Sequence, residues 1–293
     1  MTFAEMDGMP DMEQTPQIFA GCLSSYEDAR TVLFGVPYET ASRRRSGADI
    51  APQAMRNESV RMETFSPYMR VDMTDCLICD AGDLELPSGA EPALDTIESF
   101  CGKVHDDGKM PVMLGGEHIV TLGAVRAAAS RWPDLAVLHF DAHADLKREF
   151  MGETFVGYTM MRRVWDLVGD GRIYQFGVRS GSKEEFSWAM GHVRMETVSA
   201  NSIDSCAEAV LSRPVYITID LDVIDPAELP GTGMPEAGGM SFHALYDALS
   251  SLSGLDVVGF DICELSPGYD DSGTSTALAC KLLREMLIAY SCS

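Results

Sequence analysis

The chain has 293 residues, of which 46% are hydrophobic, and a formal net charge of −23. This composition supplies enough apolar residues for a large core. The charge argues against a nucleic-acid partner, because the chain has no excess of lysine and arginine to neutralise phosphates. It is compatible with a small cationic substrate, although general solubility is the simpler explanation.

We expect neither a membrane span nor a secretory signal in this sequence. No apolar stretch approaches the roughly 20 residues that cross a bilayer, and the first ten residues lack a basic region followed by an apolar one. Eight cysteines are scattered along the chain, and the CxxC pair Cys76/Cys79 has no second pair at zinc-finger spacing. We therefore predict a cytoplasmic protein with free thiols and no membrane contact.

Secondary structure is predicted from hydrophobic periodicity. Residues 1–30 are acidic and weakly patterned, and we interpret them as an N-terminal arm. Strands are expected at 31–36, 77–81, 112–114, 135–140, 172–178, 193–198, 215–219 and 255–262. Helices are expected at 55–62, 94–104, 118–129, 160–168, 242–252 and 276–290, with two more helix starts at the capping-box spacings Ser182/Glu185 and Ser205/Glu208.

This alternation predicts one α/β domain over residues 31–293, with a mostly parallel sheet of about eight strands. No linker-like or repetitive segment interrupts it. In open parallel sheets, ligands bind beyond the carboxyl ends of the strands. The residues that follow each strand are therefore the first place to look for a functional site.

Three predicted strands, which end near residues 114, 140 and 219, are followed by residues of the types that commonly bind metals in proteins. The candidate ligands are His118, Asp141, His143, Asp145, Asp220 and Asp222. One aspartate after a strand is usually a turn former or a helix cap, but three such strand ends rarely coincide. Oxygen and imidazole ligands without thiolate favour Mn²⁺ over a structural zinc site. Six ligands suit two ions that share bridging carboxylates.

The motifs around these residues resemble those of the ureohydrolase family, which includes arginase and agmatinase. The matching segments are GGEH at 115–118, FDAHAD at 140–145, IDLDVIDP at 219–226, GTGMPEAGG at 231–239 and DICELSP at 261–267. The resemblance runs from about residue 30 to the C-terminus and is closest to the agmatinase branch. It implies a three-layer arginase-like fold, two Mn²⁺ ions per chain and a homo-oligomer, either a trimer or a hexamer.

The resemblance also implies a role for each site residue. It assigns Asp141 and Asp220 as bridging ligands, His118 and Asp145 to one ion, and His143 and Asp222 to the other. Asp145 would also orient the bridging hydroxide, and Glu264 would pair with the guanidinium group of the substrate. The reaction would be attack of that hydroxide on an agmatine-like guanidino compound, which releases urea and an amine, as in polyamine metabolism.

One position departs from the agmatinase pattern. In that branch, a histidine between the aspartate-rich motif and the next helix shuttles a proton to the leaving amine. A gap-free match places Gly157 there, and a one-residue slip places Val156 there. No histidine occurs from residue 144 to 191. The neighbouring Tyr158 is a poor substitute at neutral pH, since the ordinary pKa of tyrosine is near 10.

Three interpretations therefore stay open. The protein is an enzyme whose leaving group needs less assistance or is helped by another residue, a slow or degenerate ureohydrolase, or a non-catalytic metal-binding paralogue. Glu264 and the complete ligand set favour an enzyme. A zinc deacetylase on the same fold would need a single-metal site, which the paired His/Asp set disfavours.

Overall fold

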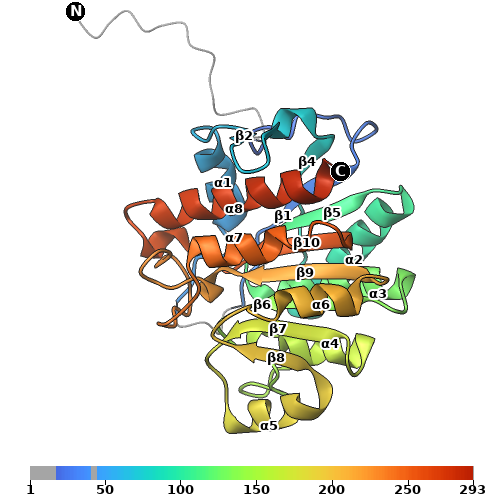
Figure 1. Cartoon of the computed structure of the whole chain (residues 1–293), viewed down its shortest axis with the longest axis vertical. Coiled ribbons are helices and arrows are strands. Elements are labelled where there is room, and N and C mark those ends of the chain that lie inside the picture. The colour runs from blue at the N-terminus through green and yellow to red at the C-terminus, as the bar shows by residue number, and fades with distance from the viewer. Residues whose placement is uncertain (1–17, 41–44, 293) are drawn as a thin grey trace, which may run out of the picture.

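An eight-stranded sheet forms the middle layer of the protein, as seen in a computed structural model that describes residues 18–40 and 45–292 (Figure 1). The strand order is β4-β1-β5-β10-β9-β6-β7-β8, and all neighbouring pairs are parallel. The strands are β1 (Thr31–Val36), β4 (Ile78–Asp83), β5 (Met110–Gly115), β6 (Ala136–Phe140), β7 (Ile173–Val178), β8 (Arg194–Thr197), β9 (Pro214–Asp220) and β10 (Asp256–Cys263). A short antiparallel pair, β2 (Phe65–Ser66) and β3 (Val71–Asp72), stands apart and was not predicted.

Helices cover both faces of the sheet. They are α1 (Ala51–Ser59), α2 (Ala90–Asp106), α3 (Thr121–Arg131), α4 (Met160–Val168), α5 (Lys183–His192), α6 (Ile203–Val210), α7 (Phe242–Ser250) and α8 (Thr274–Ser291). Residues of α1, α6, α7 and α8 share one hydrophobic cluster, and residues of α2, α3, α4 and α5 share the other. In the described segments, no helix combines the length and apolar character needed to cross a membrane. The predicted single-domain, three-layer α/β fold is confirmed.

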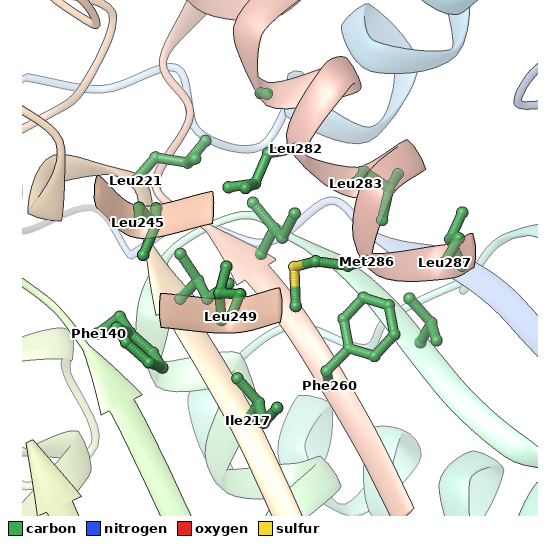
Figure 2. Packing of buried hydrophobic residues seen from close by; sticks show 14 of the residues in the cluster. Phe140, Ile217, Leu221, Leu245, Leu249, Phe260, Leu282, Leu283, Met286 and Leu287 are labelled. Atoms are coloured by element: carbon green, nitrogen blue, oxygen red, sulfur yellow. The ribbon is translucent and has the colours of Figure 1, made fainter. Parts of the chain in front are cut away.

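The two clusters are the two faces of the same strands. In β6, Leu138 and Phe140 belong to one cluster and Val137 to the other, because successive side chains on a strand point to opposite faces. Figure 2 shows the first cluster, in which leucines of α7 and α8 pack over the strand residues Ile217 and Phe260. Since both faces are covered, these strands appear in the sequence as continuous apolar runs.

Most predicted elements are confirmed, with one clear error at α6. The capping box before α5 is present, with the Ser182 hydroxyl accepting from the Glu185 N–H. The predicted start at Ser205 is wrong, because α6 begins at Ile203. The Glu196 carboxylate accepts the backbone N–H groups of residues 201 and 202, and so directs the chain into the helix earlier.

The described part of the N-terminal segment packs against the domain. Phe19 is fully buried, and its backbone N–H donates to the Asp80 carboxylate. Residues 1–17 of the predicted arm lie outside the described residues. The boundary at residue 30 stays a prediction.

One cysteine pair differs from the sequence-based expectation of free thiols. Cys76 forms a disulfide with Cys292, and their Cα atoms are 5.1 Å apart. The partners are 216 residues apart in the chain, so only the packing of the end of α8 beside the segment before β4 brings them together. The other six cysteines, Cys79 included, are buried free thiols, so the CxxC pair forms neither a disulfide nor a zinc-finger ligand set.

A buried histidine makes stability depend on pH. His105 on α2 is buried against the edge of the Trp132 ring, and burial, aided by Arg131, lowers its pKa from 6.5 to about 4. Between these values the unfolded chain binds a proton that the folded chain does not, so stability falls as the pH drops from 6.5 to about 4. The full effect is up to about 3 kcal/mol.

The variant His105→Leu should lose this part of the pH dependence, because leucine does not titrate. Denaturant unfolding of both proteins at pH 6.5 and pH 4 measures the difference. Equal losses of stability in the two proteins would contradict the role of His105.

Candidate metal centre

Four neighbouring strands deliver the predicted site residues to one edge of the sheet. These strands are neighbours in the order β5, β10, β9 and β6, and all four end at this edge. In Figure 1 it is the left edge, toward which the arrow of β9 points. His118 follows β5, Glu264 follows β10, and Asp220 ends β9 with Asp222 just beyond it. Asp141, His143 and Asp145 follow β6. The contacts described below bring all seven residues together.

The first group of ligand atoms surrounds His118. Its Nδ1 atom lies 3.3 Å from Asp141 Oδ2, 3.4 Å from Asp220 Oδ2 and 3.7 Å from Asp145 Oδ2. Atoms that bind one ion at about 2.0–2.2 Å are themselves roughly 3–3.6 Å apart. The Nδ1 atom is buried, and no hydrogen-bond partner for it occurs in the described chain. An imidazole nitrogen in this position fits a metal ligand.

The second group surrounds His143. Its Nδ1 atom lies 2.9 Å from Asp222 Oδ2 and 3.4 Å from Asp141 Oδ1. Asp141 belongs to both groups, with Oδ2 facing the first and Oδ1 facing the second. A carboxylate that offers one oxygen to each of two groups has the arrangement of a bridging ligand.

The charges of the site also fit a cation. Burial, together with the neighbouring carboxylates, raises the pKa of Asp145 and of Asp220 well above the ordinary value. Burial also acts against the charged form of Asp141, but His139, His118 and His143 hold its pKa well below the ordinary value. Buried carboxylates at this density need positive charge, which a divalent ion supplies.

Two site residues have an unusual backbone conformation. Asp145 has φ of +52° and Glu264 has φ of +71°, a left-handed region that costs non-glycine residues of order 1–3 kcal/mol. Both are held by hydrogen bonds. Glu185 accepts the N–H of Leu146, next to Asp145, and the Glu264 N–H donates to the Gly116 carbonyl. The Glu264 Oε1 atom accepts the His118 N–H at 2.7 Å, which places this carboxylate beside the first ligand group.

A row of buried polar side chains lies directly below the ligands. It consists of Asp261, Thr218, His139 and Gln175, one each on β10, β9, β6 and β7. Their Cα positions are paired in the sheet register, so the four residues are neighbours across adjacent strands. None of the four was predicted as a ligand from the sequence, but His139 lies close enough to His118, Asp141 and Asp145 to be a further candidate ligand. The row contacts His118 through Thr218 and Asp141 through His139.

Thr218 and Asp261 fix the orientation of His118. The Thr218 hydroxyl donates to Asp261 Oδ1 at 2.7 Å, and it therefore accepts from His118 Nε2, which lies 2.8 Å away. With its proton on Nε2, the imidazole turns the Nδ1 lone pair toward the carboxylates. Such outer partners commonly orient histidine ligands.

His139 and Gln175 hold Asp141 in a similar way. The Gln175 amide donates to His139 Nδ1 at 3.0 Å, so the Nε2–H of His139 donates to Asp141 Oδ2 at 2.9 Å. The sequence analysis missed these four residues because they lie inside apolar runs. A usable signal was present, since His139 and Thr218 each stand two residues before an aspartate ligand.

Residues 29–289 match the family model described as Arginase family. The chain belongs to the arginase family. It is 39% identical over 286 residues to an agmatinase of Bacillus anthracis, covering 96% of this chain and 98% of the relative. It is 34% identical to a proclavaminate amidinohydrolase of Streptomyces clavuligerus, covering 89% and 88%. The crystal structure of the agmatine ureohydrolase of Thermoplasma volcanium superposes with a TM-score of 0.87 at 37% identity, covering 94% of each chain.

In this arginase-family protein, Gly157 begins a short 3-10 turn (Gly157–Thr159) just before α4. Its backbone N–H donates to Glu117 Oε1 at 3.0 Å. The adjacent Tyr158 packs its ring against Phe150, with ring centroids 4.2 Å apart. The match of Gly157 to the family's histidine stays a prediction from the sequence.

The variant Thr218→Val should weaken metal binding by about 10- to 100-fold, because His118 Nε2 loses its acceptor. Titration calorimetry with Mn²⁺ would measure the change, with Thr218→Ser as the control that keeps the hydroxyl. Unchanged affinity in Thr218→Val would show that His118 needs no partner at Nε2.

Proposed function

We propose that this protein is a binuclear manganese hydrolase that cleaves a small guanidino compound to urea and an amine. The observation that carries the proposal is the pair of ligand groups that share Asp141. Membership of the arginase family and the similarity to agmatinases support it. The printed names of these relatives favour agmatine, or a compound like it, as the substrate.

In this proposal each ion has its own histidine. His118 and Asp145 would hold one Mn²⁺ ion, His143 and Asp222 the other, and Asp141 with Asp220 would bridge them. Two ions bound in this way would activate water as a nucleophile at neutral pH. The short distances of Asp220 to His118 and of Asp222 to His143 are consistent with this assignment.

The side chains around the ions would bind and orient the reactants. Asp145 would accept a hydrogen bond from the nucleophile and hold it in line with the guanidinium carbon. Glu264 would pair with the guanidinium N–H groups, which requires a position beside the ligands, and its contact with His118 provides that position. A net charge of −23 would favour the approach of a cationic substrate.

A second candidate is a degenerate or non-catalytic metal-binding member of the family. Gly157 favours it, because glycine has no group to protonate a leaving amine. General acid–base help typically contributes 10²–10⁴-fold, so its loss would slow the reaction without removing the metal site. The cytoplasmic location and the trimeric or hexameric state expected from the sequence stay predictions.

Urea release should appear after Mn²⁺ reconstitution with at least one member of a panel of agmatine, arginine, guanidinobutyrate, guanidinopropionate and guanidine, with formiminoglutamate assayed through formamide. Asp141→Asn should abolish release and metal binding together, because Asp141 serves both ligand groups. If the wild-type protein bound two Mn²⁺ per chain but hydrolysed no compound of the panel, the result would contradict the proposed hydrolase activity. It would favour a non-catalytic paralogue.

Gly157→His should raise kcat on agmatine by at least about 10-fold, because imidazole supplies the missing acid near neutral pH. Steady-state kinetics at pH 7–8 would measure this, and Gly157→Ala controls for the loss of glycine. A rate equal to that of Gly157→Ala would mean that position 157 is not the place of the shuttle.

A further inference from the structure

We propose that Glu117, the neighbour of His118, is a positioning residue. It holds two loops in place beside the metal centre and so sets the shape of the substrate site. The first is the β1 loop, residues 37–40, and the second is the 157 turn, residues 156–159. The effect of Glu117 on KM rests on the proposed function, whereas its effect on the mobility of the two loops does not.

Glu117 uses one carboxylate oxygen for each loop. Its Oε2 atom accepts from the backbone N–H of Thr40 at 2.7 Å and from the Thr40 hydroxyl at 2.6 Å. Its Oε1 atom accepts from the Gly157 N–H at 3.0 Å. Glu117 is 1% exposed, and its hydrogen bond with Gly157 is buried, whereas its two bonds with Thr40 are partly buried. The two loops are therefore joined through a single side chain.

The β1 loop docks on the segment that leads into His118. The Glu117 N–H donates to the Tyr38 carbonyl at 2.8 Å. A Cβ atom on Gly116 would lie 2.1 Å from the same carbonyl oxygen, so only glycine permits this close approach. The loop position and the position of the metal ligand are thus linked through the backbone.

The 157 turn docks on the segment that carries Asp145. The Lys147 N–H donates to the Tyr158 carbonyl at 3.1 Å, and the Arg162 N–H donates to the Asp145 carbonyl at 3.2 Å. Asp145 and His118 face each other in the first ligand group. The two loops joined by Glu117 therefore flank that group from two sides.

The same loops form walls of a cavity of about 610 Å³, whose lining includes none of the predicted metal ligands. Thr40 of the β1 loop and Val156 of the 157 turn line it, together with residues 86–90. If Glu117 released either loop, the walls would move relative to the ligands. A substrate that extends from the metal centre into this cavity would then lose contacts along its amine side, which raises KM more than it lowers kcat.

The test compares Glu117→Gln with Glu285→Gln. The first variant keeps the size of the side chain but replaces one oxygen with NH₂, so one loop loses its acceptor. Glu285 on α8 is also buried, and its carboxylate binds Ser66 and Arg284, which lie outside both loops. Glu285→Gln therefore controls for the loss of a buried carboxylate anywhere in the fold.

In Mn²⁺-loaded Glu117→Gln, hydrogen exchange at the amide of Thr40 or Gly157 should speed up by at least about 10-fold. KM should rise about 10-fold or more with Mn²⁺ stoichiometry unchanged. Thr40→Val, which removes only the hydroxyl donor, should raise KM less than Glu117→Gln does. Thr40→Ser, which keeps the hydroxyl, should have a KM close to that of the wild-type protein. Glu285→Gln should lower Tm without either effect.

The proposal would be overturned if Glu117→Gln lowered Tm as Glu285→Gln does but left both amides and KM unchanged. If the wild-type protein released no urea from any substrate, the proposed function would fail by itself. The exchange rates of the two amides would then still decide the role of Glu117.

Discussion

The structure depends on the burial of several carboxylates at one edge of a parallel sheet. Ionised carboxylates out of water are unfavourable unless positive charge and hydrogen bonds compensate them. Here the carboxylate oxygens converge on two imidazole nitrogens, and the raised pKa values of Asp145 and Asp220 express the shortage of positive charge. Divalent cations would resolve this conflict, which is why the cluster is a candidate metal site.

The sheet supplies the rigidity that such a site needs. Both faces are covered by helices, and the strands that carry the ligands lie next to one another in the middle of the sheet. Directly below the ligands, the in-register row from Asp261 to Gln175 replaces apolar packing with hydrogen bonds that reach His118 and Asp141. Apart from Gln175 Oε1, which has no hydrogen-bond partner, the polar atoms of the row are paired, and two of these pairings orient His118 and Asp141.

Two loops lie beside this rigid base. The β1 loop and the 157 turn come from distant parts of the chain, and Glu117 joins them next to a metal ligand. Gly157 lies on one of these loops, at the position that the resemblance gives to a catalytic histidine. The candidate metal ligands follow strands of the sheet, whereas Gly157 lies in the turn before α4, so the two features belong to separate segments.

Much of the fold could be predicted from the sequence because its signals are local. Continuous apolar runs indicated buried parallel strands, and helical periodicity with caps such as Ser182 indicated the helices between them. The error at α6 arose because the side chain of Glu196, in the strand before the helix, binds the backbone at the helix start, a contact that the capping-box spacing does not report. The ligand positions were readable because each ligand follows its strand within a few residues, and the sheet geometry brings such strand ends together.

The sequence by itself predicted the eight-stranded α/β architecture and most of the residues that the structure gathers into candidate metal groups. The tertiary structure alone decided which atoms face each other, since the sharing of Asp141 between His118 and His143 depends on the side-chain geometry at adjacent strand ends. It also decided the contacts between residues far apart in the chain, namely the row from Asp261 to Gln175, the Cys76–Cys292 disulfide and the two loops held by Glu117. Periodicity and motifs report on neighbours along the chain, whereas these contacts join segments that only folding places side by side.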